Sequence, residues 1–203
     1  MNSVEDLSAF LPKYLSDANY RTLLKELDAF PYNIDKRMYT TFLDNDILYQ
    51  GDGYHYFPVV DLAHLEKGSK NVSGIILSNT CDMDLSNLRY YPSSIMFAPI
   101  VSLENYVRTL KLREITDEQI KNHLSDIRKQ HVSSIFYLPE DAKVPESLVF
   151  LDKMNNIQSS FIDRKTLDEH RLFSLSDYGF YLLLFKLSVH FSRIREGVNR
   201  GQK

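Results

Sequence analysis

The chain has 203 residues, and its 24 basic and 27 acidic side chains give a formal charge of −3. This length fits one compact domain, and 43% apolar with 25% charged residues argues against disordered, collagen-like and coiled-coil classes. The single cysteine excludes an intramolecular disulfide and a cysteine-rich zinc site. The longest apolar run has six residues, far below the roughly 20 that cross a bilayer, and no basic segment precedes an apolar stretch at the N-terminus. We therefore expect a cytoplasmic protein without a membrane partner.

The predicted elements begin with a helical arm over residues 1–38, where apolar residues recur at helical spacing. Over residues 42–165 the pattern changes to short apolar runs broken by turn residues, which predicts a β-rich core. VSGIILS at 72–78 is β-branched and apolar, as in a buried strand. SIMFAPIVSL at 94–103 predicts a second strand, in which Pro99 indicates an edge position or a bulge. Strands this close together favour an antiparallel meander or a small barrel.

A helix inserted into the β-rich core is predicted over residues 116–131. Thr116 and Gln119 fit a capping box at its start, and a narrow apolar stripe follows. The pattern of residues 131–162 then predicts two or three further strands.

A long C-terminal helix over residues 174–200 is the last predicted element, with apolar side chains for four turns and a candidate capping box at Ser174 and Asp177. Residues 186–203 hold five basic residues and one glutamate, a local charge of +4 that leaves −7 on residues 1–185. A basic helix face can meet phosphates, and it is equally typical of a solvated surface. One narrow stripe of this helix carries Lys186, His190, Arg193 and Arg200.

The loop after the 72–78 strand, SNTCDMD at residues 78–84, is the most unusual local sequence. A buried strand delivers it to the edge of the sheet, and its small hydroxyl and amide side chains can fix a tight turn. Cys81 is a small buried hydrophobic residue, a nucleophile, or a binding residue without covalent chemistry, and all three interpretations stay open. A nucleophilic thiolate needs a nearby cation, because Asp82 and Asp84 oppose its ionisation.

The catalytic alternative makes Cys81 the nucleophile, His190 the base and Asp82 the residue that orients a partner. The two aspartates of the loop are equally typical of turn-forming residues, and His190 of a packing residue. The candidate binding residues flank the Cys81 loop or lie on the basic stripe of the last helix: Ser78, Thr80, Asp84, Arg89, Lys186, Arg193 and Arg200.

No metal site and no cofactor are predicted. The six histidines form no HxxxH or HxH pair, and the sequence contains no P-loop, no GxGxxG and no GxSxG. The 13 tyrosines and 12 phenylalanines can stack on nucleic-acid bases or fill a core.

Residues 50–101 resemble the central barrel of the MazF/PemK-type toxins, which are small SH3-like β-barrel endoribonucleases. The matching features are Gly51-Asp52, the strand at 74–78, the loop with Tyr91-Pro92-Ser93 and the strand after it. In those toxins the first of these strands is entered through an Arg-Pro pair whose Arg is catalytic, whereas here residues 71–74 contain neither Arg nor Pro. A catalytic Thr or Ser that opens the next strand in the family corresponds to Ser93 or Ser94.

A second resemblance covers most of the chain. An apolar strand followed by Ser-x-Thr-Cys-Asp, an upstream Gln50-Gly51-Asp52 and a C-terminal helix that begins around Leu175–Phe180 are similar to a set of uncharacterised bacterial proteins. This resemblance implies a bacterial or mobile-element origin and a place in toxin–antitoxin or phage-defence loci.

These observations predict a single α+β domain over residues 1–203. It is a small, mostly antiparallel SH3-like β-barrel with an N-terminal helical arm, an inserted helix and a long C-terminal helix. The leading functional hypothesis is a module that binds RNA, DNA or a protein partner through the Cys81 loop and the basic side of the last helix. The alternatives are a Cys81-dependent hydrolase or transferase, and a structural or oligomerising subunit.

Overall fold

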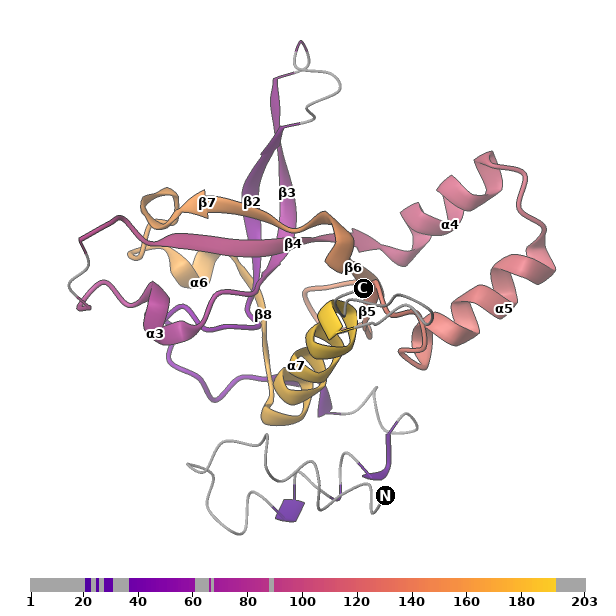
Figure 1. The fold of residues 1–203 in the computed structure, drawn as a ribbon, viewed down its shortest axis with the longest axis horizontal. Coiled ribbons are helices and arrows are strands. Elements are labelled where there is room, and N and C mark those ends of the chain that lie inside the picture. Colours follow the sequence, from indigo (N-terminus) through magenta and orange to yellow (C-terminus); the bar gives the residue numbers. More distant parts are fainter. Residues whose placement is uncertain are drawn as a thin grey trace, which may run out of the picture.

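The computed structural model describes residues 21–22, 25, 28–30, 37–60, 66, 68–87 and 90–192. Within them the fold is α+β, with eight antiparallel strands and five helices (Figure 1). The main sheet has the order β1-β8-β2-β3-β4-β6-β5, and β7 also pairs with β4. The strands are β1 (Tyr39–Thr40), β2 (Gly53–Val60), β3 (Ser69–Ile76), β4 (Ser94–Ser102), β5 (Ile135–Leu138), β6 (Ser147–Phe150), β7 (Asn155–Gln158) and β8 (Arg171–Leu175).

The sheet is open rather than closed into a barrel. In the described part of the chain, β1 and β5 stand at the two ends of the strand order and do not pair with each other. The prediction of a mostly antiparallel α+β fold is confirmed, whereas barrel closure is not observed among these strands. Figure 1 shows the β2–β3 hairpin extending away from β4, which crosses the middle of the molecule.

Strands β3 and β4 form where the apolar runs predicted them. The buried end of β3 pairs with β4 at Gly74 opposite Pro99, and a side chain at Gly74 would lie 2.8 Å from the rings of Phe57 and Phe97. These two rings stack with centroids 4.1 Å apart, so the glycine is required by close packing. Pro99 was predicted to mark an edge position or a bulge, and the edge position is wrong, because β4 pairs there with β3. Pro99 lies between Phe97, where pairing with β7 ends, and Ile100, where pairing with β6 begins, so its missing N–H removes no bond to either strand.

The inserted helix is confirmed as α5 (Asp117–Arg128), and so is its capping box. The Gln119 amide nitrogen donates to the Thr116 hydroxyl at 3.3 Å, and the Thr116 amide nitrogen donates to Gln119 Oε1 at 3.1 Å. The sequence analysis missed the helix before it, α4 (Leu103–Leu112), which Ser102 caps by accepting from the Asn105 amide. The two helices form a hairpin between β4 and β5 that projects from the sheet (Figure 1).

The C-terminal helix is α7 (Asp177–Ser192), and the proposed capping box at its start is wrong. Ser174 belongs to β8, and its hydroxyl donates to Asp52. Ser176 caps the helix instead, because its hydroxyl oxygen accepts from the Gly179 amide at 3.1 Å. The predicted continuation over residues 193–200 lies outside the described residues. Among the helices that the structure describes, none has the length and apolar character needed to cross a membrane.

The predicted helical arm falls mostly outside the described residues. Its first 20 positions are among those the structure does not describe, and the described residues between 21 and 28 are helical. The remaining short helices, α3 (Thr80–Met83) and α6 (Leu167–His170), lie at strand ends.

Lys186 corrects the prediction of a solvent-facing basic stripe on α7. Its side chain is 6% exposed, and Nζ donates to the Gln130 carbonyl oxygen at 2.5 Å, in the turn after α5. Burial lowers the pKa of Lys186 to about 8. The residue therefore joins α7 to the α5–β5 turn and is not available to a phosphate at the surface.

We expect the free energy of unfolding to carry a pH dependence that belongs to Lys186. Between its folded pKa of about 8 and an unfolded value of about 10.4, only the unfolded chain holds the proton, so stability rises with pH. Relative to Lys186→Met, the wild type should gain about 2 kcal/mol between pH 7 and 9.5. Urea unfolding of both proteins at several pH values measures this difference. A difference that stays constant with pH would contradict the buried ammonium.

Candidate functional site

Helix α3 holds the Cys81 loop in a fixed orientation. The Asn79 side-chain oxygen accepts from the Cys81 amide at 2.9 Å and caps the helix. Met83, at the other end of α3, is 2% exposed and packs into the core beneath β2, β3 and β4. The Cys81 side chain is therefore on the outer side of this turn and exposed, which excludes the interpretation of Cys81 as a buried hydrophobic residue.

The segment before β2 lies against α3. The Gln50 amide donates to the Thr80 hydroxyl at 3.0 Å, and Gln50 Nε2 donates to the Leu77 carbonyl oxygen at 2.7 Å. The Gly51 amide donates to the Ile76 carbonyl oxygen at 2.8 Å. These bonds join residues 25 to 30 positions apart in the sequence, so Gln50 and Thr80 are neighbours only in the folded chain.

A buried ion pair connects this segment to β8. Asp52 is completely buried, accepts from the Ser174 hydroxyl at 2.6 Å and lies 3.3 Å from Arg171 Nε. Burial raises the pKa of Asp52, while the Ser174 bond, Arg171 and the Tyr49 amide act in the opposite direction. Arg171 also donates to the backbone carbonyls of Asp44 and Ile47. Because β8 leads directly into α7, the pair positions the start of α7 relative to residues 44–52.

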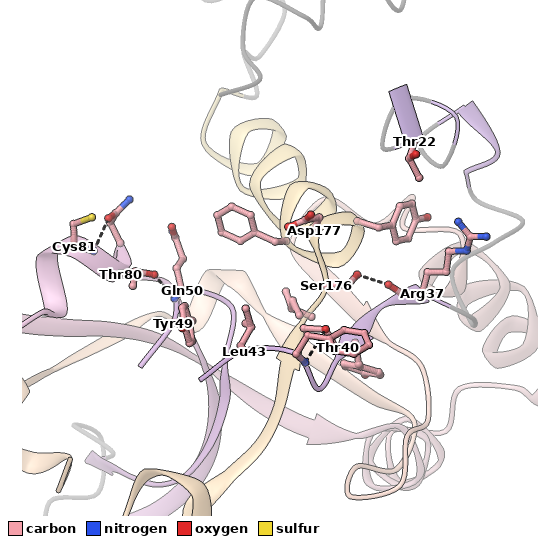
Figure 2. Close-up of a pocket in the computed structure, with 16 residues that line it drawn as sticks. Thr22, Arg37, Thr40, Leu43, Tyr49, Gln50, Thr80, Cys81, Ser176 and Asp177 are labelled. Atoms are coloured by element: carbon pink, nitrogen blue, oxygen red, sulfur yellow. Dashed lines mark hydrogen bonds between the residues drawn. The ribbon is translucent and has the colours of Figure 1, made fainter. Parts of the chain in front are cut away.

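A cavity of about 890 Å³, here named the α3–α7 cavity, opens between α3 and the first turn of α7. Figure 2 shows Gln50, Thr80 and Cys81 on one side of it, and Arg37, Ser176 and Asp177 on the other. Its remaining polar and aromatic walls include Asn79, Tyr49 and Phe180, and Phe42 lies at its edge. Residues from the segment before β2, from α3 and from the start of α7 therefore meet at one cavity.

A second cavity borders α3 at Asp82. Asp82 and Ser78 line a cavity of about 580 Å³ together with Tyr90 and Tyr91, whose side chains are almost fully exposed. A neighbouring cavity of about 570 Å³ shares Pro92 and Ser93 with it, and is also lined by Leu85, Arg164 and Lys165. We name these two adjoining cavities the tyrosine groove. Cys81 and Asp82, consecutive in α3, thus line different cavities.

Two of the predicted binding residues have structural roles that the contacts explain. The Ser78 hydroxyl accepts from the Met96 amide at 2.8 Å and so ties the loop to β4. Asp84 accepts from the Ser86 amide at 2.8 Å, and this bond is the main cause of a lowered Asp84 pKa. Asp84 therefore forms a turn, as one of its two interpretations held.

His190 does not line the α3–α7 cavity with Cys81. His190 is in the last turn of α7, thirteen residues after Asp177, which is about 20 Å along a helix axis. Its ring packs against Phe191 with centroids 5.2 Å apart. No histidine is among the described residues that line the α3–α7 cavity. Three further candidates, Arg89, Arg193 and Arg200, lie outside the described residues.

Sequence reasoning missed Gln50, Asp177 and the exposed tyrosine pair as parts of a site. The first two were noted only as parts of motifs, and nothing in the local sequence links them to Cys81. Among the described residues, no group of three or more His, Cys, Asp or Glu side chains is placed to hold a metal ion.

No protein-family model matches this chain. A comparison with curated proteins also finds no match.

Proposed function

We propose that this protein is a binding module for single-stranded nucleic acid, with α3 and its two flanking cavities as the working surface. The observation that carries the proposal is the tandem of Tyr90 and Tyr91, almost fully exposed beside a groove. Unpaired bases stack on exposed aromatic rings, and such stacking is worth about 1–3 kcal/mol per base. A duplex hides its base faces, so this chemistry favours single strands.

Charge supports this proposal less than stacking does. The tyrosine groove offers two basic side chains, Arg164 and Lys165, beside the acidic Asp82 and Asp163. The basic side of the last helix contributes less than the sequence suggested, because Lys186 is buried. With two phosphate contacts, affinity should fall about tenfold or less between 50 and 200 mM salt.

We propose that the resemblance to MazF/PemK-type toxins reflects a common origin of the fold and not a shared activity. Strands β2, β3 and β4 form a meander of successive antiparallel pairs, as an SH3-like barrel would contain, and we propose that the fold derives from such a barrel. Residues 71–74 lie in β3 without the arginine of those toxins. We therefore propose binding without ribonuclease cleavage, in a bacterial cytoplasmic protein of a toxin–antitoxin or phage-defence locus.

Replacement of both exposed tyrosines tests the proposal. We expect Tyr90→Ala with Tyr91→Ala to weaken binding of a fluorescent single-stranded RNA or DNA at least tenfold, since two stacking platforms are lost. Tyr90→Phe with Tyr91→Phe keeps both rings and should bind within about threefold of the wild type. Fluorescence anisotropy at two salt concentrations measures both, with a duplex of the same sequence for comparison.

Phe191→Ala is the matched control, because Phe191 is 70% exposed but lies at the end of α7. It should leave binding unchanged. The proposal is wrong if single strands do not bind, or if they bind equally well to the alanine pair. An affinity that does not change with salt concentration would also exclude nucleic acid as the ligand. A protein partner or a second copy of the chain would then be the remaining candidates.

A Cys81-dependent hydrolase or transferase is the second candidate, favoured by one observation: the exposed thiol lines a cavity of ligand size. It requires a base other than His190 and a cation beside the thiol. A thiol-labelling rate for Cys81 no faster than that of free cysteine counts against it. The structural-subunit alternative depended on a buried Cys81, and the thiol is exposed.

A further inference from the structure

We propose that the α3–α7 cavity takes one unpaired nucleobase of the bound strand, an inference that rests on the proposed nucleic-acid function. The cavity has about 890 Å³, within the range of about 300–1,000 Å³ that small-molecule sites occupy. Phe42, 95% exposed at its edge, and the half-buried Phe180 supply aromatic faces from two different segments. Planar heteroaromatic rings stack on aromatic faces of this kind.

Two amide side chains that line the cavity each have one polar atom hydrogen-bonded to the backbone, while the other polar atom remains for a ligand. Gln50 Nε2 donates to the Leu77 carbonyl oxygen, which leaves Oε1 as an acceptor. Asn79 Oδ1 accepts from the Cys81 amide, which leaves Nδ2 as a donor. Neither leftover atom has a partner among the described residues. Gln50 thus offers an acceptor and Asn79 a donor to the same cavity. The hydrogen-bonding edge of a base carries both kinds of group and can pair with them.

The charge of the cavity favours a base over a phosphate. Its described lining contains one basic side chain, Arg37, and one acidic side chain, Asp177. A phosphate site needs an excess of cationic or backbone N–H donors, whereas a nucleobase is uncharged. The phosphates of the strand would then stay outside the cavity.

The position of α3 connects the cavity with the tyrosine groove. Cys81 lines the cavity and the adjacent Asp82 lines the groove. A nucleic-acid strand whose bases stack on Tyr90 and Tyr91 and which crosses α3, a single helical turn, reaches the cavity with its next bases. The tyrosines supply sequence-tolerant affinity, and Gln50 and Asn79 read one base.

The single cysteine reports occupancy of the cavity. We expect a short single-stranded RNA, and at higher concentration uridine, guanosine, cytidine or adenosine alone, to slow maleimide labelling of Cys81 at least fivefold in the full chain. Asn79→Asp keeps the helix cap, because aspartate caps as well as asparagine, but removes the donor. This variant should lose the protection and bind the RNA at least tenfold more weakly. Asn122→Asp makes the same change of charge on the exposed surface of α5, outside both cavities, and should retain the protection.

Several outcomes separate this inference from the proposed function. If the RNA binds and the tyrosine pair matters, but Cys81 labels at the same rate and Asn79→Asp binds like the wild type, the base site is wrong and the binding module stands. If neither RNA nor nucleosides bind, the proposed function is wrong as well. Equal protection by inorganic phosphate, tested alone, would overturn the assignment to a base.

Discussion

Arg171→Met is expected to lower the free energy of unfolding by about 3–5 kcal/mol, as removal of one partner of a buried ion pair does. Asp52 has no exposed surface and would keep its carboxylate without the guanidinium that lies 3.3 Å away. The backbone carbonyls of Asp44 and Ile47 would also lose their donor. Urea denaturation gives the size of the loss. A variant within about 1 kcal/mol of the wild type would contradict the structural role assigned to the pair.

The matched control is Arg108→Met. Arg108 pairs with Glu104 at 3.1 Å, but both side chains are largely exposed, so this substitution should cost less than about 1 kcal/mol. Asp52→Asn combined with Arg171→Met completes a double-mutant cycle. In the double variant both charged partners are absent, so no unpaired charge remains buried. We therefore expect its loss of unfolding free energy to be smaller than the sum of the losses of the two single variants, with a coupling energy of about 1–3 kcal/mol.

The same substitution links stability to the site. The Asp52–Arg171 pair holds residues 44–52, which include Gln50, against β8 and the start of α7. Loss of the pair should therefore alter the α3–α7 cavity before the whole chain unfolds. Weaker protection of Cys81 by the single-stranded RNA in Arg171→Met at low urea would report that change in the cavity.

Elements with strong local patterns could be predicted from the sequence. The apolar runs of β3 and β4 and the capping box of α5 are short-range features, and each formed as predicted. Helix α4 was missed because it follows β4 directly, with Ser102 as its cap and no turn residue between them. β8 was missed because its charged first residue, Arg171, is buried by an ion pair that only the fold creates.

The sequence singled out the Cys81 loop, which the structure places beside two cavities, but it did not identify the residues that share those cavities with the loop. Helical periodicity placed Lys186 and His190 on one face of the last helix, and periodicity says nothing about what packs against a face. The Gln130 carbonyl, 56 residues away in sequence, covers Lys186. Likewise, Gln50 and Asp177 reach the Cys81 cavity through strand pairing and the buried Asp52–Arg171 pair, which are long-range contacts without a local sequence pattern.

Gly179→Ala is expected to destabilise the fold by about 1–3 kcal/mol, although alanine normally stabilises a helix relative to glycine by about 0.5–1 kcal/mol. Gly179 lies in the first turn of α7, where an added Cβ would be 2.3 Å from the Met38 carbonyl oxygen and 2.9 Å from the Met38 sulfur. The carbonyl cannot move freely, because it accepts from the Ser176 amide at 2.9 Å. The helix or the segment before β1 must therefore shift.

The sign of this effect separates packing from helix propensity. Ser188→Ala, on the exposed side of the same helix, changes propensity without a clash and should be neutral or stabilising by a few tenths of a kcal/mol, roughly the spread of propensities. Opposite signs for the two variants in urea unfolding are the expected result. Because Tyr178 and Phe180, the neighbours of Gly179, line the α3–α7 cavity, a displaced first turn should also change the labelling rate of Cys81. A Gly179→Ala protein as stable as the wild type would show that α7 does not pack on Met38 as closely as described, and that the wall of the cavity is not fixed by this contact.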